Sequence, residues 1–161
     1  MSQVTLESLI NPELPKPDKV EISIDQYNGV IHHFSNLMKV EPYSDEVIKE
    51  LENELQFNLG SLTKELLRSS GNLIIGDFEV PNKTKLVELT NKWRNEIASD
   101  EDKLKFVVIE ADGDDFTLVN SNDEIFVYDG ETKQTDPDDT TVITHICKHI
   151  FAKIIGKDYK Y

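Results

Sequence analysis

The chain has 161 residues, of which 31 are acidic and 17 basic, giving a formal net charge of −14. This length suits a domain with its own hydrophobic core, so folding requires neither a disulfide nor a structural metal. A surface this negative repels phosphate backbones and anionic lipid. The charge therefore argues against direct binding to nucleic acid or a membrane surface, and it favours either a basic partner or a role in solubility only.

The single cysteine and the N-terminal sequence both bear on the compartment. One cysteine excludes an internal disulfide framework and fits a reducing environment. The N-terminus shows no basic region followed by an apolar core, so we expect no signal peptide. No segment approaches the ~18 consecutive apolar residues of a membrane span. We therefore expect a cytoplasmic protein.

The N-terminal forty residues predict an extended arm followed by a hairpin. Residues 1–18 contain three closely spaced prolines, which disfavour a helix and indicate an extended Pro-rich arm. From Val20 to Asp25, apolar and polar residues alternate as in a half-buried strand. Asn28-Gly29 is a strong hairpin turn signal, so a second strand is predicted over residues 30–34.

Two helices and a strand are predicted in the next part of the chain. Ser44 can cap the first helix, which carries one apolar stripe at helical spacing, namely Val47, Ile48, Leu51 and Leu55. Ser61 is predicted to cap a shorter helix that Gly71-Asn72 ends. Residues 73–80 then predict a single strand, which stops before Pro81.

The C-terminal half predicts a helix, a meander and a last helix. The first helix covers residues 83–98, and the most apolar strand, residues 104–111, is placed at the centre of the sheet. Strands over residues 116–120 and 124–129 complete a three-stranded antiparallel meander. An acidic loop then leads to the last helix, residues 141–155.

The order of these elements indicates the fold class. Strands and helices do not alternate as in βαβ units, so the chain from residue 19 to residue 161 is predicted to be a single α+β domain. We expect a mostly antiparallel sheet of about five to six strands, with helices packed against it.

Acidic residues concentrate in one part of the chain. Fourteen acidic and three basic residues lie between Asp100 and Asp139, mostly in predicted turns and in the acidic loop. One interpretation is a surface that attracts a basic protein and speeds its encounter. The other is a solvated surface that only keeps sheet edges from pairing. The candidate partner-binding residues are eight of these acids and one aromatic anchor: Asp112, Asp114, Asp115, Tyr128, Asp129, Glu131, Asp136, Asp138 and Asp139.

Metal binding by these side chains is weakly indicated. Counted from Asp112, the sixth position of an EF-hand loop would be Thr117 instead of glycine, so that motif is absent. Adventitious divalent binding at the 112–115 turn stays open. His145 and His149 are four residues apart and could share a metal, but the helical phase places them on the flank away from the apolar side, as surface histidines.

Catalytic motifs are absent from the sequence. It contains no nucleophile elbow, no phosphate-binding loop and no dinucleotide glycine fingerprint. Cys147 lies on the apolar side of the last helix, where burial makes a thiol inert. We therefore predict that the protein is not an enzyme and needs no cofactor or metal, with a small enzyme or metal-dependent protein as the third hypothesis.

The helical opening has a recognisable order. Residues 47–55 read Val-Ile-Lys-Glu-Leu-Glu-Asn-Glu-Leu, and Leu59, Leu62 and Glu65-Leu66-Leu67 follow. This order resembles the SUKH superfamily, whose members begin with an Ile-x-x-Leu-Glu helix, a Leu-Pro step, a second short helix and an Asn-Gly before the first strand. The later meander over residues 104–129 and the final helix over residues 142–155 resemble the rest of that family's fold.

Three features of the chain depart from the family pattern. Gly60-Ser61 stands where the family usually has proline, Gly71-Asn72 reverses the expected Asn-Gly, and the N-terminal hairpin arm is extra. The resemblance covers residues 43–155.

The resemblance implies an α+β fold and a bacterial immunity protein. Such proteins bind and neutralise a cognate toxin, often a nuclease, of a polymorphic or contact-dependent system. Some relatives serve instead as regulatory interaction modules, and the family supplies no catalytic residues. We therefore predict a non-catalytic protein-binding domain whose partner is a basic, nuclease-type toxin domain. The alternative is a regulatory scaffold or adaptor module that binds a host protein without inhibiting it, and the oligomeric state stays open.

Overall fold

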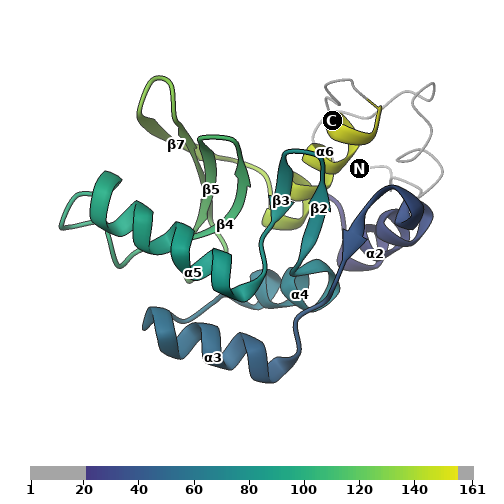
Figure 1. Ribbon diagram of the computed structural model, residues 1–161, viewed down its shortest axis with the longest axis horizontal. Coiled ribbons are helices and arrows are strands. Elements are labelled where there is room, and N and C mark those ends of the chain that lie inside the picture. The colour runs from purple at the N-terminus through teal and green to yellow at the C-terminus, as the bar shows by residue number, and fades with distance from the viewer. Residues whose placement is uncertain (1–20, 156–161) are drawn as a thin grey trace.

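The computed structural model describes residues 21–155, so the predicted arm lies outside the described residues. Figure 1 shows helices arranged around a sheet. The five α-helices of the described residues are α2 (Ile24–His33), α3 (Asp45–Leu55), α4 (Ser61–Ser70), α5 (Lys83–Lys92) and α6 (Val142–Ile155). A 3-10 turn, η1 (Ser35–Leu37), follows α2, and a π-helical segment, η2 (Trp93–Ile97), extends α5.

Seven strands form one sheet whose order follows the chain, and every neighbouring pair is antiparallel. The strands are β1 (Lys39–Val40), β2 (Leu73–Ile75), β3 (Phe78–Val80), β4 (Val107–Asp112), β5 (Asp115–Val119), β6 (Ile125–Asp129) and β7 (Gln134–Asp138). The predicted α+β class and the central position of β4 are confirmed. The sheet has seven strands, more than the five to six expected.

The predicted N-terminal hairpin is wrong, because the segment forms helix α2. Ser23 Oγ accepts a hydrogen bond from the Gln26 amide at 3.2 Å, and Gln26 Oε1 accepts one from the Ser23 amide at 3.0 Å. This reciprocal capping box starts the helix, and Tyr27 and Val30 then face the core at helical spacing. Asn28-Gly29 therefore lies inside a helix instead of forming a turn.

Two further strand predictions need correction. Residues 73–80 form a hairpin of two strands, because Gly76, with a φ of 58°, and Asp77 turn the chain between Ile75 and Phe78. The segment predicted as an acidic loop contains β7, an edge strand with Pro137 inside it. Proline and acidic residues are tolerated there because an edge strand pairs on one side only.

The four helices predicted after residue 43 are present, but the cap of α4 differs from the prediction. Gly60, and not Ser61, is the N-cap, and its lack of a side chain leaves room for a carboxylate from the β5–β6 turn. The two oxygens of Asp123 accept hydrogen bonds from Leu62 N at 3.2 Å and Thr63 N at 2.9 Å. The helix is therefore capped by a residue distant in sequence.

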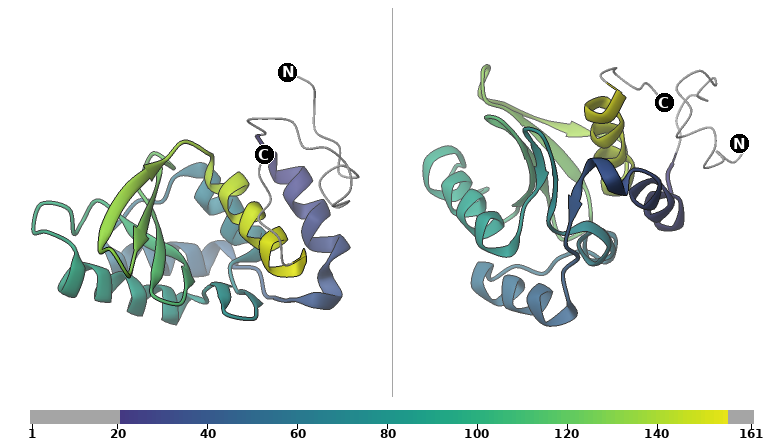
Figure 2. Two further views of the ribbon diagram at one scale, coloured as in Figure 1. Left: turned by 90° about the horizontal axis from the view of Figure 1, so that it is seen from above. Right: turned by 45° about the vertical axis from the view of Figure 1, so that its right-hand side comes forward.

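Helices cover both faces of the sheet. Figure 2 shows α5 against one face and α2, α4 and α6 against the other. The larger apolar core lies on the α6 side, and a smaller one on the α5 side contains Trp93, Phe116 and Tyr128.

A bulge in β4 decides which of its side chains face α6. Val108 pairs with Leu118 and Glu110 pairs with Thr117, so Ile109 is an extra residue on this strand. Ile109 packs in the α6-side core, while Val108 and Ala111 both pack in the α5-side core. Glu110 consequently points to the α6 side directly after Ile109, against simple alternation.

Candidate functional site

Five of the predicted acidic residues come together at one end of the sheet. The β4–β5 and β6–β7 turns touch there, because Asp115 Oδ1 accepts a hydrogen bond from Gly130 N at 2.8 Å. A Cβ added at Gly130 would lie 2.6 Å from Asp114 Cβ, so only glycine permits this approach. We call this surface the acidic tip: Asp112, Asp114, Asp115, Asp129 and Glu131.

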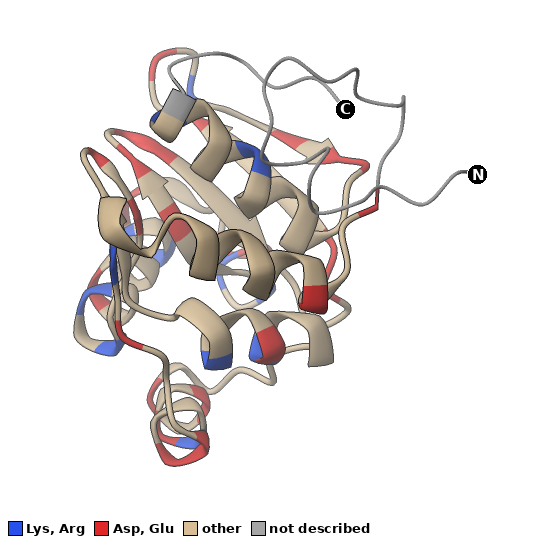
Figure 3. Cartoon of the chain, turned by 90° about the vertical axis from the view of Figure 1, so that its right-hand side faces the viewer, with Lys and Arg blue, Asp and Glu red and all other residues tan. Residues whose placement is uncertain are grey.

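The members of the acidic tip have different local roles. Asp129 Oδ1 accepts hydrogen bonds from Glu131 N at 2.8 Å and Thr132 N at 3.3 Å, which shapes the turn. Asp112 pairs with Lys153 of α6 at 3.1 Å. Asp114 and Glu131 are exposed. Figure 3 shows acidic segments on the strands and turns of the sheet, while α2 and α6 beside them carry few charged residues.

The other three predicted acids do not join the acidic tip. Asp136 is exposed on β7, Asp139 follows the end of that strand, and Asp138 is only partly exposed. A strand advances roughly 3.3 Å per residue, so most of the length of β7 separates Asp138 and Asp139 from the tip. Asp138 is engaged inside the protein, where its Oδ1 accepts from Thr140 N at 2.9 Å.

Tyr128 is not the exposed anchor that was predicted. Its side chain is 6% exposed, and its ring contacts Trp93 edge-on at 5.7 Å and stacks on Phe116 at 5.9 Å between centroids. The residue therefore belongs to the α5-side core. An aromatic side chain on a strand is more often such a core residue than a contact surface, because burial removes its large apolar area from water.

A chain of hydrogen bonds links β7 to the centre of the sheet through α6. Asp138 Oδ2 lies 3.0 Å from His145 Nδ1, and His145 Nε2 lies 3.0 Å from Thr117 Oγ1. The Thr117 hydroxyl donates in turn to Glu110 Oε2. Glu110, Thr117 and His145 are 2%, 1% and 6% exposed, so these contacts are inside the protein. We call these four residues the polar chain.

The directions of these hydrogen bonds locate the protons. The Thr117 hydroxyl has one proton, which it donates to Glu110, so it accepts from His145 Nε2. The hydrogen bond from His145 holds the pKa of Asp138 well below its usual range, so Asp138 accepts from Nδ1 as a carboxylate. His145 therefore joins two carboxyl-bearing branches of the polar chain through its two ring nitrogens.

Glu110 titrates near neutral pH. Burial raises its pKa to about 7, against the opposing effect of the Thr117 hydrogen bond. When Glu110 holds a proton, it can donate that proton to the Thr117 hydroxyl, and the Thr117 hydroxyl can then donate to His145 Nε2. The arrangement therefore keeps its hydrogen bonds in two protonation patterns.

His149 lies next to the polar chain. Its ring stacks on Phe78 with centroids 5.5 Å apart and lies 4.6 Å from the His145 ring, and its Nδ1 is 3.4 Å from Glu110 Oε1. Burial, with a smaller contribution from the charge of His145, lowers the pKa of His149 to about 4. The ring is therefore neutral at pH 7.

The prediction of surface histidines is wrong for His145, which is buried like the other residues from Val142 to Cys147. The His149 side chain is partly exposed, at 34%. The predicted burial of Cys147 is confirmed, and burial raises the pKa of its thiol.

The polar chain does not form an accessible catalytic site. Asp138, His145 and Thr117 have the order of an acid, a base and a hydroxyl, as in a hydrolase triad. The Thr117 side chain is 1% exposed, so a substrate carbonyl has no path to its hydroxyl. Within residues 21–155, no three His, Cys, Asp or Glu side chains are placed to hold a metal ion. The hydrogen bonds of the polar chain therefore link β4, β5, α6 and β7 inside the protein.

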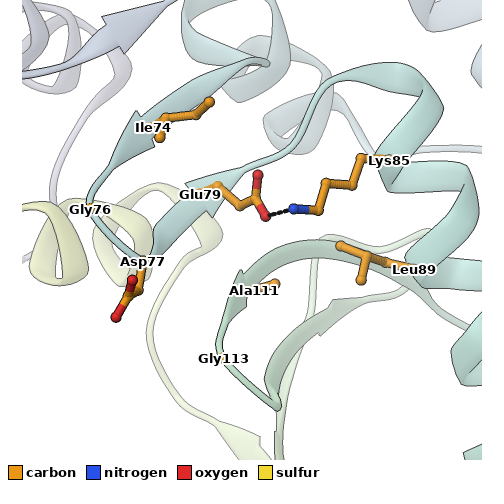
Figure 4. Close-up of a pocket in the computed structure, with 8 residues that line it drawn as sticks. All are labelled: Ile74, Gly76, Asp77, Glu79, Lys85, Leu89, Ala111 and Gly113. Carbon is orange, nitrogen blue, oxygen red and sulfur yellow. Dashed lines mark ion pairs between the residues drawn. The ribbon is translucent and has the colours of Figure 1, made fainter.

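A groove lies beside the acidic tip, between the β2–β3 hairpin, the β4–β5 turn and α5. Its volume is about 440 Å³. Figure 4 shows Glu79 and Lys85 joined as an ion pair across it. We call it the hairpin groove, and its lining residues are Ile74, Gly76, Asp77, Glu79, Lys85, Leu89, Ala111 and Gly113.

Comparison with known proteins identifies a family. The family model SUKH_5, described as SMI1-KNR4 cell-wall, matches residues 20–147. The match includes α2, the segment that the resemblance had treated as extra. A comparison with curated proteins finds no match. In the part of the chain that the structure describes, every helix is too short or too polar to cross a membrane.

Proposed function

We propose a function from one premise: this chain belongs to the SMI1-KNR4 family of the SUKH superfamily. The proposed function is that of a cytoplasmic, non-catalytic immunity protein. It binds and neutralises a basic, nuclease-type toxin domain of a bacterial polymorphic or contact-dependent system. The observation that supports a basic partner is the acidic tip, where the contact between Asp115 and Gly130 holds two turns together.

The acidic tip suits occlusion of a basic cleft. A nuclease cleft is basic because it binds phosphate, and the exposed carboxylates of Asp114 and Glu131 can occupy it in place of that substrate. Both lie on turns fixed by hydrogen bonds, so little conformational freedom is lost on binding. Complementary charge of this kind raises the association rate and fixes register.

The proposal is tested first by finding the partner. We would capture proteins from a lysate of the source organism, with washes at about 50 mM and about 300 mM salt, because charged contacts weaken as the screening length shortens. The immunity function requires one basic protein that is toxic in a naive host and harmless when this chain is co-expressed. Recovery of housekeeping proteins that stay active in the complex would indicate the adaptor instead.

A matched pair of variants then tests the acidic tip. Asp114→Asn with Glu131→Gln removes two exposed charges from the tip, and Glu46→Gln with Glu88→Gln removes two exposed charges from α3 and α5. We expect the tip variant to slow association with the captured toxin by about threefold to tenfold at low salt, with little change at high salt. Equal slowing in both variants would show that only net charge matters. Asp138 is left unchanged because it belongs to the polar chain.

A further inference from the structure

The burial of Tyr128 leaves the proposed interface without an anchor from this chain. Tight interfaces concentrate binding energy in a few side chains that enter pockets, and arginine is among the most frequent of them. The hairpin groove supplies a pocket next to the acidic tip. Gly113 lines the groove and sits between Asp112 and Asp114 of the acidic tip, so the two surfaces are continuous.

The groove combines an apolar surface with carboxylates. Ile74, Leu89 and Ala111 provide the apolar part, and Ile74 is 40% exposed although it is a large hydrophobic residue. Asp77 and Glu79 provide two negative charges against the single positive charge of Lys85, which is paired with Glu79. The lining is therefore net negative.

The two hairpin turns that border the groove have open space at their glycines. Gly76 and Gly113 occupy the two hairpin turns with φ values of 58° and 64°, and a Cβ added at either would meet nothing within 4 Å. Neither turn is therefore packed against another described residue at its glycine.

We infer that the hairpin groove receives an arginine side chain of the partner protein. This inference rests on the proposed function and names the partner's anchor. The flat guanidinium is weakly hydrated and can lie against the apolar part of the lining, and the unpaired charge of Asp77 at the β2–β3 turn favours a cation there. An apolar side chain would desolvate the Asp77 carboxylate without compensation. An anion would meet net negative charge, because Glu79 already neutralises Lys85.

The test uses N-acetyl-arginine methylamide as the probe and N-acetyl-citrulline methylamide as its neutral isostere. Each would be titrated into the ¹⁵N-labelled full chain while amide chemical shifts are followed by NMR. We expect the arginine probe to shift the amides of Gly76, Asp77, Ala111 and Gly113, with salt weakening the effect. The citrulline probe should leave these four amides unchanged.

Two variants locate the site, and one serves as control. Asp77→Asn should weaken binding of the arginine probe by about threefold to fivefold, and Ile74→Thr should weaken it by a similar factor by removing apolar contact. Glu88→Gln removes an equal charge from an exposed position on α5 outside the groove and should leave binding unchanged.

Equal shifts with both probes, or arginine shifts spread over the acidic tip and unaffected by Asp77→Asn, would overturn the inference. These outcomes are separable from failure of the proposed function. If the captured toxin is still neutralised but the arginine probe does not shift the groove amides, only the assignment of the groove is wrong. If the groove binds arginine but no toxin is ever neutralised, the immunity function fails.

Discussion

The two faces of the sheet are joined to their helices by different chemistry. On the α5 side, Trp93, Phe116 and Tyr128 form an aromatic cluster with the helix. On the α6 side, an apolar core is interrupted by the polar chain, which ends on edge strand β7 at Asp138. Both arrangements exclude water, yet only the second changes when protons are added or removed.

The comparison separates two sources of stability. Aromatic burial gives a contribution that hardly depends on pH, because it comes from apolar area removed from water. A buried polar chain stabilises only while all its members are satisfied, since an unpaired carboxyl or imidazole in the interior is costly. We therefore expect the contribution of the α6 side to the free energy of unfolding to depend on pH.

The largest effect is expected on the aromatic face. Trp93→Ala removes a side chain that is 4% exposed and should lower the free energy of unfolding by about 3–5 kcal/mol. Urea denaturation at pH 5.5 and pH 7.5 measures this loss, which should be equal at both values. Trp93→Phe is the control with a smaller loss, because it keeps a ring and removes a buried indole N–H that has no hydrogen-bond acceptor among the described residues. A loss confined to one pH would contradict the division between the faces.

A smaller effect is expected at the centre of the polar chain. Thr117→Val keeps the shape of the side chain but removes the hydroxyl between Glu110 and His145. Leaving these two groups unsatisfied should lower the free energy of unfolding by about 2–3 kcal/mol at pH 7, again measured in urea. Thr117→Ser keeps the hydroxyl and should cost about 1 kcal/mol or less. A Thr117→Val protein as stable as the parent would show that the polar chain contributes nothing net.

The finest test separates two opposing titrations on the α6 side. The pKa of Glu110 rises from 4.5 to about 7 on folding, so its contribution to stability is complete below pH 4.5 and is lost as the pH rises towards 7. The pKa of His149 falls from 6.5 to about 4, so its contribution is complete above pH 6.5 and is lost as the pH falls. Each slope is about 1.4 kcal/mol per pH unit, and the two oppose each other in the shared window.

We therefore expect the parent's free energy of unfolding to vary little between pH 4.5 and pH 6.5, where these windows overlap. Glu110→Gln should make stability fall as the pH is lowered through this range, and His149→Gln should make it rise. The double variant should restore the flat profile. Denaturation curves at half-unit pH intervals measure these slopes, and flat profiles for both single variants would refute the opposition.

Much of the fold could be predicted because the spacing of apolar residues indicates which segments form helices and which form strands. The stripe Val47, Ile48, Leu51 and Leu55 predicts α3, and the apolar run in β4 predicts the central strand. The failures occurred where two local signals compete. Asn28-Gly29 is a turn signal in isolation, but the Ser23–Gln26 capping box and the buried Tyr27 and Val30 determine a helix. Strand β7 is almost wholly polar, so its pairing with β6 leaves no apolar pattern to read.

The site was less predictable than the fold. The acidic turns could be found from composition, but their contact depends on Gly130 approaching Asp114, which no local pattern reports. Tyr128 and His145 were misplaced because burial depends on what packs against the sheet from other elements. A signal for the polar chain was present in Glu110, a charged residue within the most apolar strand, since such a residue is buried only with partners.

The bulge at Ile109 changes the alternation of side chains between the two faces of the sheet along β4. Strict alternation from Val107 would assign Glu110 and Asp112 to the α5 side, yet Glu110 meets Thr117 and Asp112 meets Lys153 on the other. One extra residue thus exchanges the face of the sheet on which each later side chain of β4 lies, up to the acidic tip. The position of an acid beside the histidines is consequently encoded in the number of residues in the strand. Exchanging one side chain for another does not alter that number, whereas an insertion or deletion shifts the phase at once.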